Sequence, residues 1–123
     1  MYTLDTNALI YYIAGDPSAK SLFFRLFGNN SGIIVPTIVV VEFFSFPRLT
    51  KQDDDLFSDL LPNFELFPLD FTTAKHAARL RKQYRISLAD GVVAATALAT
   101  NSQLITRNLR DFKKVEGLRV VNI

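Results

Sequence analysis

The feature that most constrains this chain is the alternation of short apolar runs with longer helix-like segments. Five runs have the length and composition of buried strands: residues 2–5, 32–36, 64–69, 103–106 and 118–123. Most segments between them carry helix start and stop residues: 6–15, 17–28, 50–61, 70–84 and 87–100. Such alternation predicts a parallel sheet with helices on both faces. We therefore expect one α/β domain over residues 1–123, with three layers and a central, mainly parallel sheet of four or five strands.

Residues 37–46, TIVVVEFFSF, fit neither pattern clearly. Their β-branched residues favour a strand. Their length, with Thr37 as a candidate N-cap, also allows a buried helix. The residues alone leave both interpretations open.

Four acidic residues stand where a parallel sheet binds its ligands, beyond the carboxyl ends of the strands. Asp5 ends the first run, and Asp111 follows the fourth. Glu42 and Asp90 lie in the first turns of segments that begin near strand ends. Each has an ordinary structural explanation. Asp5 could be a helix cap, and Glu42 could face outward or pair with a distant base. Asp90 could be the capping-box partner of Ser87, and Asp111 could be a turn residue.

Glu42 is the hardest of the four to explain in this way, because its neighbours are nearly all apolar and no Lys or Arg lies within one helical turn. A buried, unpaired carboxylate is costly, so we expect a cation or a proton beside it. Four carboxylates at one edge would repel each other and raise their pKa values. The chain has no Cys and a single His, so an all-oxygen ligand set indicates Mg²⁺ or Mn²⁺.

The charge is distributed unevenly along the sequence. Residues 1–73 hold nine acids and four bases, whereas residues 74–123 hold ten bases and three acids. A basic half of this kind favours an anionic partner, although solvated helix faces would give the same count. Around the last acid we expect Arg107, Arg110 and Lys113 to bind the phosphates of that partner.

The stretches LDTNALI, VVVEFF, ISLADGVVAATALAT and LITRNLRDF resemble, in order and over the whole chain, the motifs of PIN-domain ribonucleases, specifically VapC-like toxins of toxin–antitoxin pairs. The resemblance implies a PIN-like sandwich, a metal-dependent endoribonuclease, a cognate antitoxin and a helix at residues 37–46. It assigns the acidic set to Asp5, Glu42, Asp90 and Asp111. It assigns the supporting polar residues to Asn7, Thr106 and Asn108. One departure is Gly91, where Ala is commoner in relatives.

Metal-assisted hydrolysis is the mechanism that these residues allow, since neither a Ser-His-Asp set nor a Cys nucleophile is available. We expect Asp5 and Asp90 to be the main metal ligands. Two other classes remain open. A haloacid-dehalogenase-type phosphatase would need a second Asp where this chain has Asn7, and a non-catalytic RNA-binding PIN scaffold would be expected to lack part of the acidic set.

The apolar content exceeds what one small core needs, which predicts an interface. The residues expected to contribute are Leu22, Phe23, Phe24, Leu26, Phe27, Phe43, Phe44 and Phe46. The resemblance to the toxins implies that this surface serves a homodimer and a groove for the antitoxin, whereas a thin domain that buries all of these residues is the alternative. The first residues do not form a signal peptide, and no uncharged apolar stretch could span a membrane, so we expect a cytoplasmic location.

Overall fold

The computed structural model describes residues 1–123. The strands are β1 (Tyr2–Leu4), β2 (Ile33–Pro36), β3 (Phe64–Phe67), β4 (Gln103–Thr106) and β5 (Val120–Asn122). The α-helices are α1 (Thr6–Ile13), α2 (Pro17–Gly28), α3 (Thr37–Phe44), α4 (Lys51–Leu60), α5 (Phe71–Tyr84), α6 (Leu88–Ala99) and α7 (Leu109–Phe112), with a short 3₁₀ turn, η1, at Leu61–Asn63. No helix is long and apolar enough to span a bilayer.

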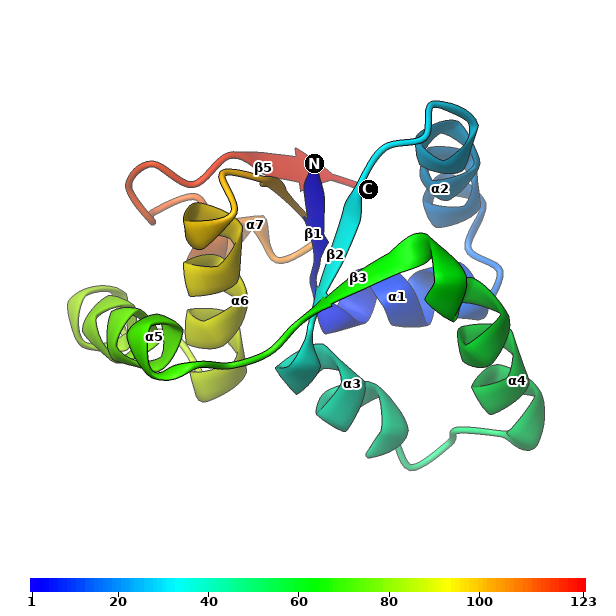
Figure 1. Cartoon of the computed structure of the whole chain (residues 1–123), viewed down its shortest axis with the longest axis horizontal. Coiled ribbons are helices and arrows are strands. Elements are labelled where there is room, and N and C mark those ends of the chain that lie inside the picture. The colour runs from blue at the N-terminus through cyan, green and yellow to red at the C-terminus, as the bar shows by residue number, and fades with distance from the viewer.

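The five strands form one sheet in the order β3-β2-β1-β4-β5, and every neighbouring pair is parallel. Helices α5 and α6 lie on one side of the sheet, and α1, α2 and α4 on the other (Figure 1). This confirms the three-layer α/β prediction. The chain builds outward from β1 to β3 and then returns to place β4 on the other side of β1. The crevice between β1 and β4 is therefore the switch point at which such sheets bind ligands.

Polar side chains fix where the helices begin. Asp5, Asp16, Asp70 and Ser87 each accept a hydrogen bond from a backbone N–H in the first turn of the helix that follows. Thr50 and Asp53 form the reciprocal capping box that their spacing predicts. These caps satisfy N–H groups that have no partner within the helix.

Residues 37–44 are helical, as the resemblance implied and against the strand propensity of their Val and Ile residues. Val39 and Phe43, four residues apart, are buried on one face of α3, whereas Val41 on another face is 61% exposed. Burying one helical face outweighs a helix-propensity cost of about 0.5 kcal/mol per β-branched residue.

The expected interface at α2 is wrong for most of its residues. Phe23 is completely buried and stacks on Tyr12 with 4.3 Å between ring centroids. Leu22 and Leu26 are also buried, whereas Phe24 is 81% exposed. Phe43, expected to add to the same surface, is 1% exposed. These rings belong to the core because a thin domain with a helix on each face has two apolar layers to fill.

Close packing of α5 on α6 accounts for Gly91. A Cβ atom at this position would lie 2.7 Å from Cγ of Arg81 and 3.1 Å from the carbonyl oxygen of Ala77. The glycine therefore lets α5 approach the first turn of α6, next to Asp90.

Candidate active site

Three of the four predicted acids line one cavity of about 240 Å³. Asp5 follows β1, Glu42 lies on α3, and Asp90 lies in the first turn of α6. In Figure 1 the arrows of β1 and β2 lead toward the start of α1 and toward α3, so the cavity opens at the carboxyl edge of the sheet. No Lys or Arg forms an ion pair with any of the three acids.

Asp5 is the most buried of these acids, at 5% exposure. Its Oδ1 accepts a hydrogen bond from the backbone N–H of Thr6 at 2.8 Å, and its Oδ2 accepts one from Thr106 Oγ1 at 2.7 Å. Burial raises the pKa of Asp5 to about 6. The hydrogen bond from Thr106 opposes this rise, and the nearby Asp90 charge adds to it. The protein thus holds Asp5 rigidly but leaves its charge uncompensated.

Asn108 connects Asp90 with Asp111, the fourth predicted acid. Its Nδ2 donates to Asp111 Oδ2 at 3.1 Å and lies 3.4 Å from Asp90 Oδ2. Burial raises the pKa of the half-buried Asp90, with smaller contributions from Asp111 and Glu42, whereas the hydrogen bond with Ser87 opposes the rise. Asp111 lies outside the cavity lining. Its link to the cavity is the hydrogen bond from Asn108, whose amide also lies near Asp90.

Glu42 is exposed, so the expectation that it is buried is wrong. The buried face of α3 carries Val39 and Phe43, which leaves Glu42 at the mouth of the cavity. Its Oε1 accepts a hydrogen bond from Thr6 Oγ1 at 2.5 Å. Sequence reasoning missed Thr6, which contacts both Asp5 and Glu42. A hydroxyl residue directly after the first acid was the available signal.

Two of the predicted supporting residues, Thr106 and Asn108, hydrogen-bond to acids of the proposed set. Thr106 Oγ1 donates to Asp5 and accepts from the backbone N–H of Asn108 at 3.0 Å. Asn7 is exposed and lines the cavity, but its side chain forms no hydrogen bond with an acid. Its role as an orienting residue stays a prediction.

The predicted phosphate-binding residues differ in their surroundings. The Arg110 side chain is 92% exposed and lies 3.7 Å from Asp111, and Lys113 is also exposed. Arg107 is different, because its guanidinium already contacts Asp16 and Tyr11.

The donor set suits a hard divalent cation, although no three acidic or histidine side chains are grouped tightly enough to hold one ion as they stand. The cavity offers carboxylate oxygens without sulfur or cationic neighbours, which is the chemistry preferred by Mg²⁺ and Mn²⁺. Mutual repulsion opposes a closer approach of unpaired carboxylates.

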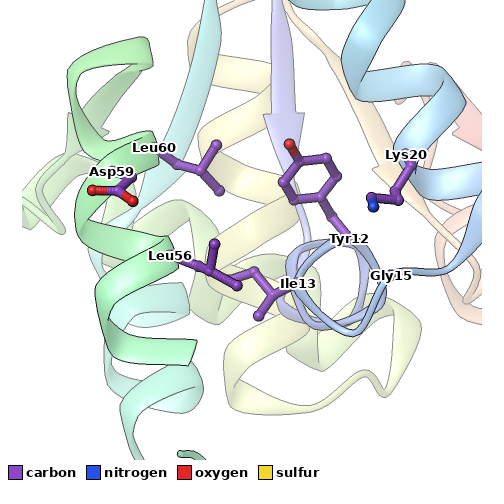
Figure 2. A pocket seen from close by; sticks show the side chains of 7 residues that line it. All are labelled: Tyr12, Ile13, Gly15, Lys20, Leu56, Asp59 and Leu60. Carbon is purple, nitrogen blue, oxygen red and sulfur yellow. The ribbon is translucent and has the colours of Figure 1, made fainter. Parts of the chain in front are cut away.

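A second hollow, the α1–α4 groove, lies between α1 and α4 and shares no lining residue with the acid cavity. It has a volume of about 260 Å³ and is lined by Tyr12, Ile13, Gly15, Lys20, Leu56, Asp59 and Leu60. Figure 2 shows Leu56 and Leu60 of α4 extending toward Ile13 and Tyr12 of α1, with Lys20 beyond the tyrosine ring. The floor of the groove is therefore apolar, and charged groups stand at its rim.

Comparisons with known proteins agree with this architecture. The PIN domain family matches residues 2–118. The chain is 25% identical to Ribonuclease VapC2 of Rickettsia felis over 130 residues, which cover 99% of this chain and 97% of that protein. It is 25% identical to Ribonuclease VapC19 of Mycobacterium tuberculosis over 122 residues, covering 97% and 98%.

Solved structures show the same likeness. VapBC2 from Rickettsia felis, bound to a DNA fragment from its promoter, matches with a TM-score of 0.83 at 25% identity and covers 99% of this chain and 98% of that one. A toxin–antitoxin complex from Klebsiella pneumoniae matches with a TM-score of 0.81 at 27% identity, covering 98% and 96%. The nearly full-length match, on a parallel sheet with acids gathered at its carboxyl edge, shows that this chain belongs to the PIN domain family.

Proposed function

We propose that the protein is a metal-dependent endoribonuclease that hydrolyses RNA phosphodiester bonds and serves as the toxin of a toxin–antitoxin pair. The observation that carries this proposal is the convergence of Asp5, Glu42 and Asp90 on one cavity, where no Lys or Arg side chain pairs with them. Relatives named as VapC ribonucleases support the choice of RNA as substrate.

Asp5 and Asp90 would hold Mg²⁺ or Mn²⁺, with Glu42 and Asp111 completing the site directly or through water. A bound divalent cation supplies charge neutralisation at the phosphate and makes water more acidic. Thr106 keeps Asp5 Oδ2 in a fixed direction through its 2.7 Å hydrogen bond. Asn108 keeps Asp90 and Asp111 on either side of its amide.

Glu42 is suited to receive a proton. Thr6 occupies its Oε1, whereas its Oε2 accepts no hydrogen bond within the protein. Because the side chain stands at the mouth of the cavity, Oε2 can accept a proton from the attacking water.

Cleavage of RNA should require a divalent cation. Purified protein incubated with a mixed-sequence single-stranded RNA and Mg²⁺ or Mn²⁺ should produce internal cuts, measured by gel electrophoresis. Excess EDTA should stop cleavage, and added Mn²⁺ should restore it. Cleavage that persists in EDTA would rule out the metal mechanism. Binding without cleavage under any cation would favour the non-catalytic RNA-binding scaffold.

Arg110 and Lys113 should contribute to RNA affinity through phosphate contacts. Replacing both by Glu should weaken binding and reduce the salt slope by about 1.4, because each lost contact to single-stranded RNA contributes about 0.7. The measurement is fluorescence anisotropy at several salt concentrations in EDTA. The matched control replaces Arg79 and Lys82, on the exposed face of α5, and should leave the slope unchanged. If neither variant changes the salt slope from that of the unsubstituted protein, the basic half is only a solvated surface.

The α1–α4 groove is where we place a segment of the cognate antitoxin, because it offers an apolar floor and is not lined by the proposed ligand acids. Several solved relatives are toxin–antitoxin complexes, which supports a partner of this kind. Leu56→Glu should raise the dissociation constant for the antitoxin about 30-fold or more, as expected for a buried contact. Calorimetry with the cognate antitoxin measures this. Leu66→Glu, at a similarly exposed position on β3, should have little effect.

A homodimer also stays a prediction. The exposed apolar residues Phe24, Phe71 and Leu88 leave surface for it, in place of the buried Phe23. Light scattering at micromolar concentration would show a dimer, and a monomer would refute this part of the proposal.

A further inference from the structure

The loop that follows β4 presents its side chains in two directions. Thr106 and Asn108 turn toward the acids, where they hydrogen-bond to Asp5 and to Asp90 and Asp111. Arg107, between them, turns away from the cavity, and none of its contacts is with a proposed metal ligand. The residue between the two supporting residues is therefore bound to a different part of the molecule.

Arg107 makes three contacts with three separate segments. Its Nη2 pairs with Asp16 Oδ2 at 2.6 Å, and its Nε donates to the carbonyl oxygen of Ile123 at 2.9 Å. Its guanidinium lies 3.9 Å from the centre of the Tyr11 ring. The hydrogen bond to Asp16 raises the pKa of Arg107, whereas the hydrogen bonds from the Ala19 backbone N–H and then from Arg107 lower the pKa of Asp16.

These contacts matter because they join the loop to segments outside the acid cluster. Asn108 has a non-helical backbone (φ −83°, ψ 65°), and α7 begins without a side-chain cap. The backbone N–H groups within the loop bond only locally, from Asn108 to Thr106 Oγ1, from Leu109 to the Arg107 carbonyl and from Phe112 to the Asn108 carbonyl. By contrast, Asp16 is fixed by its own role as N-cap of α2, where it accepts from Ala19 N–H at 3.0 Å.

We infer that Arg107 is a positioning residue, which fastens the loop to α1, to the N-cap of α2 and to the C-terminal residue so that Thr106 and Asn108 meet the acids. The consequence for catalysis rests on the proposed function above. A planar guanidinium can make an ion pair, a stacking contact and a third hydrogen bond at once, which a lysine ammonium cannot do. Because these groups already surround it, Arg107 is not a ligand of the RNA phosphates, in contrast to the expectation from sequence.

Two substitutions test this inference. Arg107→Lys keeps the charge but loses the fork and the stacking. Asp16→Asn keeps a good N-cap for α2 but loses the ion pair, so it disturbs the contact from the other side without touching Arg107. Each should lower kcat by roughly 10–100-fold with little change in KM, as expected when residues that orient metal ligands are disturbed. The double variant should be no worse than the more severe single variant, because both remove one interaction.

Readouts other than activity separate this role from phosphate binding. In both single variants Mn²⁺ affinity, measured by calorimetry, should fall about tenfold or more, and amide hydrogen exchange over residues 106–112 should accelerate. The salt slope of RNA binding in EDTA should not change. Arg107→Gln removes the charge and tests the alternative. A salt slope reduced by about 0.7 in this variant, with Mn²⁺ affinity and exchange unchanged, would make Arg107 a phosphate ligand and overturn the inference.

The exposed Arg110→Lys is the control and should alter neither Mn²⁺ affinity nor exchange. If the unsubstituted protein does not cleave RNA, the proposed function fails, whereas Mn²⁺ affinity and hydrogen exchange still decide the role of Arg107. Unchanged exchange and unchanged Mn²⁺ affinity in Asp16→Asn would overturn that role independently of any cleavage result.

Discussion

Asp90→Asn should leave the protein folded and reduce RNA cleavage by about 10²–10⁴-fold. The substitution keeps the shape of the side chain and the hydrogen bond from the Asp90 backbone N–H to Ser87 Oγ, so α6 should still begin at the same residue. It removes one of the two main carboxylate ligands proposed for the cation. Losing several kcal/mol of transition-state stabilisation corresponds to a rate decrease of this size. Initial rates of RNA cleavage and Mn²⁺ affinity are the measurements.

Asp55→Asn is the matched control, because it removes an exposed acid of α4 and leaves the cavity unchanged. Its cleavage rate should equal that of the unsubstituted protein, and circular dichroism should show all three proteins folded. An Asp90→Asn protein that binds Mn²⁺ normally and cuts RNA at full rate would show that the metal site lies elsewhere.

The second large effect concerns stability. Asp5→Asn should make the cation-free protein more stable at pH 8, by up to about 3 kcal/mol, and should raise its Tm by roughly 10 °C. Burial raises the pKa of Asp5 from an ordinary value of 3.8 to about 6, so ionising this group opposes folding. Asn carries no charge, and its carbonyl oxygen can still accept the hydrogen bond from Thr6 N–H. Thermal unfolding in EDTA measures the difference.

The pH dependence gives this prediction a definite sign. Below pH 3.8 Asp5 is protonated in both the folded and the unfolded chain, so it contributes no penalty. The penalty grows as the pH rises from about 4 to about 6 and is constant above that range. The advantage of Asp5→Asn should therefore be small at pH 4 and complete by pH 7. Mg²⁺ should stabilise the unsubstituted protein more than the variant, since Asp5 is a proposed ligand of the cation in the folded state.

Asp70→Asn provides the control, because Asp70 is also an aspartate N-cap but has a lowered pKa. It should bring no gain in stability at pH 8, and Asn is an equally good cap. A lower Tm for Asp5→Asn than for the unsubstituted protein in EDTA at pH 8 would show that the Asp5 charge is compensated in the folded protein.

Local signals in the sequence predicted the order of the elements and the edge of the sheet that holds the acids. Asp5 and Thr106 follow apolar runs, and the parallel sheet brings the ends of these runs together. The capping box of Thr50 was predicted from Asp53, three positions later. Features that depend on neighbours in sequence or on the general rules of parallel sheets were therefore accessible without coordinates.

Features that depend on which face a helix buries were not accessible. Glu42 was expected to be buried because the residues around it are apolar, but α3 buries only the face of Val39 and Phe43. Phe23 was expected at an interface because the apolar content exceeds what one small core needs. The sequence does not show that the aromatic rings must fill two apolar layers. The contact of Arg107 with Asp16 joins residues 91 positions apart, and no local pattern indicates such a pairing.

The hydrogen bond from Thr106 to Asp5 has a consequence for the nascent chain during its synthesis on the ribosome. It joins residues 101 positions apart, so β1, the central strand of the sheet, acquires its β4 neighbour only after residues 103–106 have been synthesised. At typical elongation rates about 5–20 s separate the synthesis of these two residues. During that time the growing chain carries Asp5 without Thr106, Asn108 or Asp111. The proposed site is therefore incomplete on the nascent chain until β4 and the loop after it have been synthesised.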